Sequence, residues 1–419
     1  MDVFNPRALL LLTPVMPAAG GNGLAMRAGA QLVALAAYYD VAVVVVPVAG
    51  GSPDASWAER YASSVALVLP GGPDEVRAGL MRLVGDAAWR DRLRRCEPFP
   101  AAVTHAGPAL AGRVAEAAGG IRPARVHALR AYLAPLAVAV GEQVAAPWTT
   151  LDLDDDDEHL LEGEGRTAEA QAYARLLETF GREFSWLSLA SPEDAARVAA
   201  RRGLPTVVVP NSVAVPSEIT GRARRQAGRA SLLFVGNLTY GPNAEAAEAL
   251  VRDVLPRVRR LVGRPVGVEL VGSYERGGRV EALAGHDGVA VRGQVADLEG
   301  AYASADAAVV PLLRGSGTRI KLLEALAAGV PVVTTAVGAA GLGAESGRHL
   351  LVGRDADELA AAVARVVLDE QFASTLVSAG RSFVEGRFSS AIVGAHLREL
   401  AIALDPAPRS GDQPALGEL

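Results

Sequence analysis

Cationic side chains and a glutamate gather around a glycine-rich turn near residue 320. An apolar run at residues 307–312, typical of a buried strand, precedes the turn, and Thr318 then stands where a helix could begin. Backbone N–H groups and the helix dipole make a helix N-terminus attractive to anions. Arg319 and Lys321 fall in the first turn, where positive charge opposes that dipole unless an anion lies in front of it. The segment therefore predicts a site for a diphosphate, stabilised by Arg319 and Lys321.

The same helix carries Glu324, three residues beyond Lys321 and hence beside it on the helix surface. Gly329 and Pro331 are typical of the end of such a helix. On spacing alone, a plain strand–helix unit with a surface Lys321–Glu324 pair is the alternative interpretation.

Composition limits the class of protein. The 419 residues suffice for two domains with full cores, and the formal net charge of −6 argues against a general nucleic-acid binder. The single Cys96 permits no internal disulfide and indicates a reducing compartment. No apolar run is long enough to cross a bilayer, and the N-terminus lacks a signal-peptide pattern, so we expect a cytoplasmic protein.

A strand, a glycine-containing loop and a helix follow one another in two parts of the chain. Residues 8–12 and 41–48 read as strands on either side of a helix at 24–38, and a strand at 231–235 is again followed by a glycine-containing loop and a helix. This pattern predicts parallel, doubly wound α/β sheets. The first loop lacks a full G-x-G-x-x-G and the second strand ends without an acidic residue, which disfavours an NAD-dependent oxidoreductase.

Residues 315–333, Gly-Ser-Gly-Thr-Arg-Ile-Lys-Leu-Leu-Glu-Ala-Leu-Ala-Ala-Gly-Val-Pro-Val-Val, resemble the sugar-nucleotide signature of family-4 glycosyltransferases. That family has the GT-B fold, two Rossmann-like domains facing a central cleft. The resemblance implies a retaining enzyme that moves a sugar from a nucleoside diphosphate to an acceptor hydroxyl, in glycan, glycolipid or natural-product biosynthesis, without a metal or other cofactor. Its departures are Ser316, where many members have a second glutamate, and Asn237 and Tyr240, near positions where many carry an arginine and a lysine.

The resemblance also divides the chain. Residues 1–215 would form the acceptor-binding domain and residues 216–388 the nucleotide-sugar domain. A helix at 389–404 would cross back to the first domain, and a disordered tail would occupy 405–419.

The resemblance and the loops together give a set of candidate site residues. The donor-binding candidates are Gly20, Gly21, Asn22, Gly23, Gly236, Asn237, Tyr240, Gly293, Val295, Gly315, Ser316, Gly317, Thr318 and Glu324, the last holding the ribose hydroxyls. The catalytic candidates are Arg319, Lys321 and His127, the last expected in a loop after a strand of the first domain. The acceptor-binding candidates are Arg130, Asp155 and Asp156.

The aspartates at residues 152–157 are expected to form a solvated loop. An Asp-x-Asp triplet at 152–154 could hold a metal in a GT-A enzyme, but a GT-B enzyme needs none, so no metal site is predicted.

Two alternative functions, a membrane contact and the partners stay open at this stage. The departures leave room for a catalytically silent nucleotide-sugar-binding protein, and a nucleotide-sugar epimerase shares the GT-B architecture. The basic, amphipathic residues 77–95 could rest on the inner face of an anionic membrane, although a solvated face explains them as well. The expected partners are a nucleotide-sugar and an unidentified acceptor, with no nucleic acid, in a monomer or homodimer.

Overall fold

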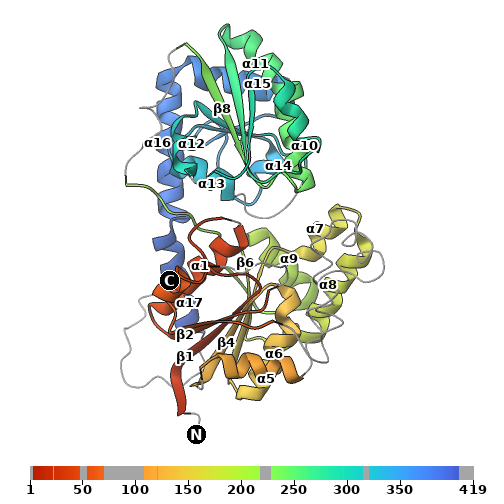
Figure 1. Cartoon of the computed structure of the whole chain (residues 1–419), viewed down its shortest axis with the longest axis vertical. Helices are drawn as coiled ribbons and strands as arrows, with labels where there is room; N and C mark the ends of the chain where they lie inside the picture. The colour runs from red at the N-terminus through yellow and green to blue at the C-terminus, as the bar shows by residue number, and fades with distance from the viewer. Residues whose placement is uncertain are drawn as a thin grey trace. The chain divides into compact units, whose positions relative to one another are not determined.

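The computed structural model describes residues 3–21, 23–47, 54–69, 108–119, 121–217, 228–295, 297–314 and 320–404 (Figure 1). These residues divide into two compact units. The first comprises the described residues up to Val209 and those from Gly394 on, and the second is Pro210–Val393. The predictions on residues 77–95 and on the tail from 405 lie outside the described residues.

The first unit is built on a parallel sheet with the strand order β3-β2-β1-β4-β5-β6-β7 among its described residues. The strands are β1 (Val3–Thr13), β2 (Asp40–Val45), β3 (Ser64–Leu67), β4 (Ile121–Leu129), β5 (Trp148–Asp154), β6 (Trp186–Leu189) and β7 (Thr206–Val208). The order reverses at β1, where β2 pairs on one side and β4 on the other. Loops after the strands at such a switch point are the usual ligand site of an open α/β sheet.

Helices cover both faces of this sheet because its strands are apolar on both sides. They are α1 (Gly23–Ala36), α5 (Pro108–Ala117), α6 (Ala134–Val144), α7 (Asp157–Gly163), α8 (Thr167–Phe180), α9 (Pro192–Arg202) and α17 (Ser390–Ala403). In β1, Leu10 and Leu12 join the core that α5, α6, α8 and α9 cover. The alternate residues Leu9 and Leu11 are equally buried and point to the other face of the sheet.

The second unit is a parallel sheet with the order β10-β9-β8-β11-β12-β13. Its strands are β8 (Ala230–Val235), β9 (Val266–Val271), β10 (Val289–Arg292), β11 (Ala307–Val310), β12 (Val332–Thr334) and β13 (Leu351–Val352). Its helices are α10 (Gly241–Ala249), α11 (Leu255–Val262), α12 (Leu298–Ala303), α13 (Ile320–Ala327), α14 (Ala336–Ala339), α15 (Ala356–Leu368) and α16 (Glu370–Arg387), with a π-helical turn (Leu250–Val254) between α10 and α11. The order reverses between β8 and β11, so the loops after these two strands are neighbours.

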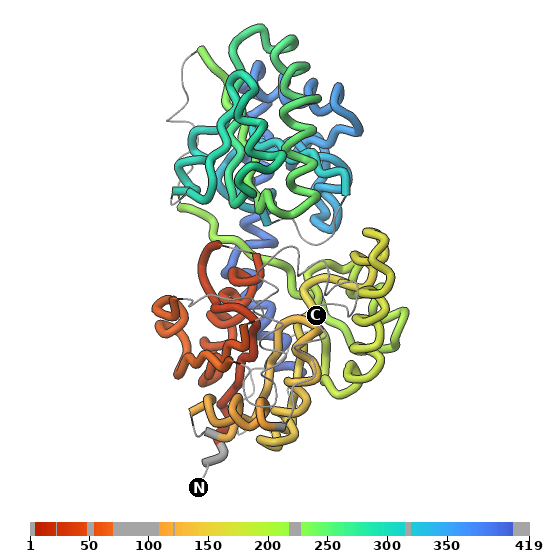
Figure 2. The backbone as a smooth tube through the Cα atoms, turned by 45° about the vertical axis from the view of Figure 1, so that its right-hand side comes forward, coloured from red at the N-terminus to blue at the C-terminus, as the bar shows by residue number. Residues whose placement is uncertain are grey.

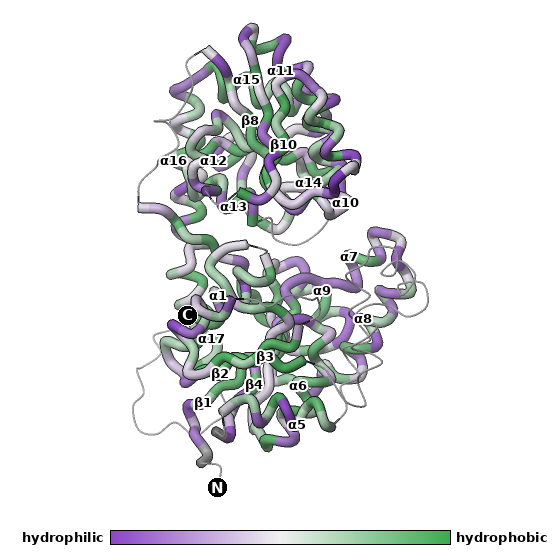
Figure 3. The backbone as a smooth tube through the Cα atoms, viewed as in Figure 1, coloured by the Kyte–Doolittle hydropathy of each residue, from purple (hydrophilic) through white to green (hydrophobic). Residues whose placement is uncertain are grey.

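The backbone course confirms that each unit alternates strands and helices, as the sequence pattern predicts (Figure 2). Hydrophobic residues concentrate in the strands inside each unit and hydrophilic residues on the helices around them (Figure 3). The chain returns to the first unit at its end, where Tyr39 Oη donates to the carbonyl of Ala401 at 3.4 Å and His396 contacts the carbonyl of Val208 at 3.0 Å. Of the helices described, none combines the length and apolarity needed to span a membrane.

Candidate functional site

Three neighbouring strands of the second unit end on glycines. Gly236 follows β8, Gly272 follows β9 and Gly293 follows β10, and the Gly272 N–H donates to the carbonyl of Gly293 at 2.9 Å. Gly272 has φ +135°, and a Cβ built on it would lie 1.9 Å from the carbonyl oxygen of Gly236. Only glycine allows this approach, so the carboxyl edge of the sheet is packed backbone against backbone at this point. Gly236 and Gly293 were predicted from the sequence, and Gly272 was not.

Lys321 reaches this edge from α13. Its Nζ donates to Asn243 Oδ1 at 2.5 Å and lies 5.1 Å from the centre of the Phe234 ring. A Cβ on Gly236 would come within 3.0 Å of the same Nζ. The structure therefore places the Lys321 ammonium beside the end of β8, next to the switch point. Its role on a diphosphate stays a prediction.

Glu324 lies one turn further along α13 and is half-buried. Tyr302, buried on α12, donates its hydroxyl to Glu324 Oε2 at 3.2 Å. Burial raises the pKa of Glu324, while the Tyr302 hydrogen bond and the charge of Lys321 act in the opposite direction. Glu324 is thus a partly desolvated carboxylate. The alternative interpretation, an exposed surface pair with Lys321, does not fit this environment.

The other donor candidates in this unit lie at the same edge. Asn237 is exposed and accepts from the Thr239 hydroxyl at 2.7 Å, and Tyr240, 40% exposed, stands at the N-cap of α10. Val295 is also exposed, beyond Gly293. The predicted Gly315, Ser316, Gly317, Thr318 and Arg319 lie outside the described residues, as does Asn22 of the first unit.

Arg314, the residue before 315–319, is bound to α10. Arg314 holds Glu245 of α10 through two hydrogen bonds, 2.8 Å from Nε and 2.6 Å from Nη2. Because Asn243 on the same helix binds Lys321, α10 contacts the chain both before and after residues 315–319.

In the first unit, Gly20 and Gly21 lie between β1 and α1, and Gly23 is the first residue of α1, at the switch point of that sheet. Gly21 has φ +106°, a conformation that favours glycine. Their contact with a donor stays a prediction.

His127 is not in a loop, and this expectation was wrong. It lies inside β4 and is buried, with Nδ1 2.6 Å from Thr150 Oγ1 and Nε2 2.9 Å from Gln31 Oε1. Burial lowers its pKa to about 4, and the positive charge of Arg27 adds to this against the effect of Asp152. With both ring nitrogens engaged and the ring neutral, this environment supports a structural role.

His127 belongs to a buried polar layer between the sheet and α1, which the sequence did not reveal. Its centre is the Arg27–Asp152 pair, with Nε–Oδ2 and Nη2–Oδ1 distances of 2.6 Å. Ser188 of β6 donates to Asp152 Oδ1 at 2.5 Å. Burial alone would raise the pKa of Asp152, but Arg27 and these hydrogen bonds hold it below its usual range.

The aspartates that follow Asp152 do not form a solvated loop, a second correction. Asp154 has φ +68° at the end of β5, and Arg130 has φ +75° after β4. Arg130 binds Asp157 at 2.6 Å and Asp154 at 3.4 Å. Burial, together with the charge of Asp154, raises the pKa of Asp155 to about 8 despite the opposing charge of Arg130. The predicted Arg130 and Asp155 therefore meet in one cluster at the carboxyl edge of this sheet.

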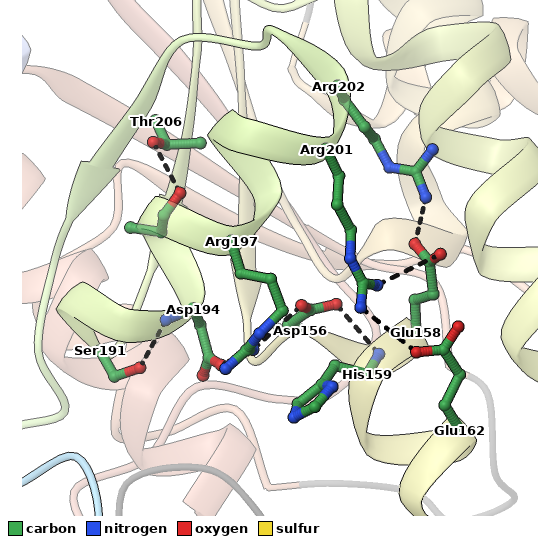
Figure 4. A network of polar contacts seen from close by, with 11 residues as sticks. Asp156, Glu158, His159, Glu162, Ser191, Asp194, Arg197, Arg201, Arg202 and Thr206 are labelled. Carbon is green, nitrogen blue, oxygen red and sulfur yellow. Dashed lines mark hydrogen bonds and ion pairs between the residues drawn. The ribbon is translucent and has the colours of Figure 1, made fainter.

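Asp156 has a different environment. It caps α7 by accepting from the His159 N–H at 3.1 Å, and it binds Arg197 of α9 at 3.1 Å. Figure 4 shows three arginines of α9 directed at acidic residues of α7 and at its cap. The further pairs are Arg201 with Glu158 and Glu162, both at 3.3 Å, and Arg202 with Glu158. The structure thus gives the Asp156 side chain a role in joining two helices, and its contact with an acceptor stays a prediction.

No group of three or more His, Cys, Asp or Glu that could hold a metal ion occurs among the described residues.

Known proteins resemble this chain in fold and in one domain. Residues 229–369 match the family model described as glycosyl transferases group 1. The sucrose-phosphate synthase of Thermosynechococcus elongatus has a TM-score of 0.68 at 18% identity, covering 95% of this chain and 99% of that one. HepE of Anabaena, solved in complex with UDP and glucose, has a TM-score of 0.64 at 17% identity, covering 94% and 99%. A glycosyltransferase from Rickettsia africae has a TM-score of 0.65 at 12% identity, covering 96% and 99%.

No curated protein sequence matches the chain significantly. The structural matches and the two parallel sheets confirm the predicted fold class. The chain has the GT-B fold, and residues 229–369 of its second unit match the group 1 glycosyl transferases.

Proposed function

We propose that this chain is a retaining family-4 glycosyltransferase that moves a sugar from a nucleoside-diphosphate sugar to an acceptor hydroxyl, in glycan, glycolipid or natural-product biosynthesis. The observation that carries the proposal is the placement of Lys321 and Glu324 one turn apart on α13, with the Lys321 ammonium beside the glycine at the end of β8. The family-model match over the same unit and the GT-B fold support a glycosyltransferase.

The two charged side chains suit the two ends of a nucleoside diphosphate. The Lys321 ammonium beside Gly236 would stabilise the negative charge of the leaving diphosphate, together with Arg319. Glu324, with one carboxylate oxygen accepting from Tyr302, would accept hydrogen bonds from the ribose hydroxyls. HepE has been solved with UDP-glucose, which supports a nucleotide-sugar as the donor class here.

The acceptor would bind in the first unit, near Arg130 and Asp155. Burial and the charge of Asp154 raise the pKa of the Asp155 carboxyl and so favour its protonated form, in which it would donate a hydrogen bond to an acceptor oxygen. His127 and Asp156 are left out of this proposal because their polar atoms already hold protein partners. We further propose that the reaction uses no metal, since cations of the protein would carry the charge of the diphosphate, and that the protein works in the cytoplasm.

Thermal stabilisation by UDP-, GDP- and dTDP-sugars tests this proposal. A ligand at 100 times its Kd adds about 2.7 kcal/mol of stability to the state that binds it. We expect one nucleotide class to raise the Tm of the wild type and of the control Glu299→Ala, an exposed glutamate of α12, and to have no effect on Glu324→Ala. If no nucleotide-sugar shifts the wild-type Tm, with or without Mg²⁺, the proposal is wrong.

A further inference from the structure

Asn243 is a buried polar residue at the site whose function no motif predicted. It stands third in α10 and is only 8% exposed. Its Oδ1 accepts from Lys321 Nζ at 2.5 Å, and its Nδ2 donates to the carbonyl of Asn237 at 2.8 Å. An ammonium can only donate and a carbonyl can only accept, so the two partners fix the orientation of the amide. Asn243 thereby links the Lys321 side chain to the loop after β8.

The missing side chain of Gly236 leaves the room that the ammonium and the amide occupy. A Cβ on Gly236 would lie 3.0 Å from Lys321 Nζ and 3.1 Å from Asn243 Nδ2. The centre of the Phe234 ring, two residues before Gly236, lies 5.1 Å from Nζ. Lysine has a long flexible side chain, and the Asn243 hydrogen bond together with the Phe234 ring holds its charged end at the carboxyl end of β8.

The chemical nature of Asn243 matters for an anionic ligand. A carboxylate at the same position would also hold the ammonium, but it would neutralise its charge. A neutral amide holds the ammonium by a hydrogen bond to a charged donor without cancelling that charge. The Asn243 amide therefore holds the Lys321 ammonium in place and leaves its attraction for an incoming anion intact.

We propose that Asn243 is a positioning residue that sets the Lys321 ammonium for the diphosphate of the donor. This inference rests on the proposed function and adds to it a residue that acts through Lys321. It follows that a change at Asn243 affects the affinity for phosphate groups and spares the affinity for the nucleoside.

The test is a double-mutant cycle read by ligand binding. Calorimetry gives the Kd of inorganic pyrophosphate, of the nucleoside diphosphate that stabilises the wild type, and of the matching nucleoside, for the wild type, Asn243→Asp, Lys321→Met and the double variant. Arg252→Gln is the matched control: it lowers the net charge by one, as Asn243→Asp does, at an exposed side chain of the same helical run. Circular dichroism and Tm show whether each variant is folded, and Asn243→Ala replaces Asn243→Asp if the latter is not.

We expect Asn243→Asp to weaken diphosphate and pyrophosphate binding by about tenfold or more, since a hydrogen bond to a charged group is altered and the cation neutralised. Nucleoside binding should change less than about twofold, as should all affinities of Arg252→Gln. In the Lys321→Met background, the Asn243→Asp change should weaken diphosphate and pyrophosphate binding by less than about twofold, because its effect passes through Lys321.

Two results would overturn the inference. Equal losses from Asn243→Asp in both backgrounds, or equal losses for nucleoside and diphosphate, assign Asn243 a structural role only. Both leave the proposed function standing, since the wild type still binds the nucleotide. Failure of the wild type to bind any of the ligands contradicts the proposed function itself, and the inference with it.

Discussion

The strongest prediction from the first unit concerns the buried Arg27–Asp152 pair. Both side chains are almost inaccessible, 2% and 0% exposed, and two hydrogen bonds of 2.6 Å join them. We predict that Arg27→Met destabilises the first unit strongly, because it leaves the Asp152 carboxylate buried without its counter-charge.

The magnitude follows from burial and geometry. Removing one member of a buried ion pair costs about 3–5 kcal/mol, whereas replacing both members by neutral groups costs far less. In the double variant Arg27→Met/Asp152→Asn, the asparagine amide carries no charge and still offers an oxygen to Ser188. We therefore expect the double variant to be more stable than Arg27→Met alone. With a urea m-value of about 3 kcal/mol/M, Arg27→Met lowers the midpoint by about 1 to 1.7 M.

Tryptophan fluorescence reports this unfolding selectively. All four tryptophans, at 57, 89, 148 and 186, precede Val209, so the signal comes from the chain of the first unit. The control is Glu162→Gln, which removes the more exposed Arg201–Glu162 pair and should change stability by no more than about 1 kcal/mol. A cost below about 1 kcal/mol for Arg27→Met, or a double variant as unstable as the sum of the single ones, would refute the reasoning.

Three further predictions use other parts of the structure. Gly272→Ala should destabilise the second unit by more than about 2 kcal/mol, because its Cβ would meet a backbone oxygen and its φ is positive; circular dichroism during urea unfolding measures this, and a neutral effect contradicts the close approach. Burial lowers the pKa of His127 from 6.5 to about 4, so between these values the unfolded chain binds a proton that the native state does not. Stability should therefore fall as pH drops from 6.5 to 4, less steeply in His127→Gln, and an unchanged slope would rule this out. Tyr302→Phe removes a hydrogen bond that lowers the pKa of Glu324, so this pKa should rise in the variant. As the pH is lowered, the variant should therefore lose nucleotide affinity at a higher pH than the wild type does. Superimposable pH profiles would show that the bond does not tune the carboxylate.

Local sequence patterns were sufficient to predict parallel, doubly wound sheets, and the resemblance of residues 315–333 to a known family added the GT-B fold. The apolar runs at residues 8–12, 231–235 and 307–312 became β1, β8 and β11, because a strand buried on both faces needs no polar alternation. Pro192 at the first position of α9 and Gly203 after it mark helix ends by backbone chemistry alone. Such signals depend on a few neighbouring residues and are visible in a single sequence.

The polar interior was not predictable in this way because its members are far apart in the chain. Arg27 and Asp152 are separated by 125 residues, and Tyr302 and Glu324 by 22. A run of aspartates indicates a solvated loop unless counter-charges are known to approach it, and those come from α1, from Arg130 and from α9. His127 was misplaced for the same reason: nothing local shows that Gln31 and Thr150 meet its ring inside the sheet.

The most direct test of the proposed function is transfer itself. The wild type, Glu324→Ala and Glu299→Ala are incubated with the nucleotide-sugar that stabilises the protein, labelled in the sugar, and with a mixture of lipid, saccharide and small-molecule acceptors. We predict that wild type and Glu299→Ala release the nucleoside diphosphate and form a labelled product with the anomeric configuration of the donor, while Glu324→Ala does neither. Binding of the nucleotide-sugar without release or transfer would contradict the enzyme and favour a silent nucleotide-sugar-binding protein.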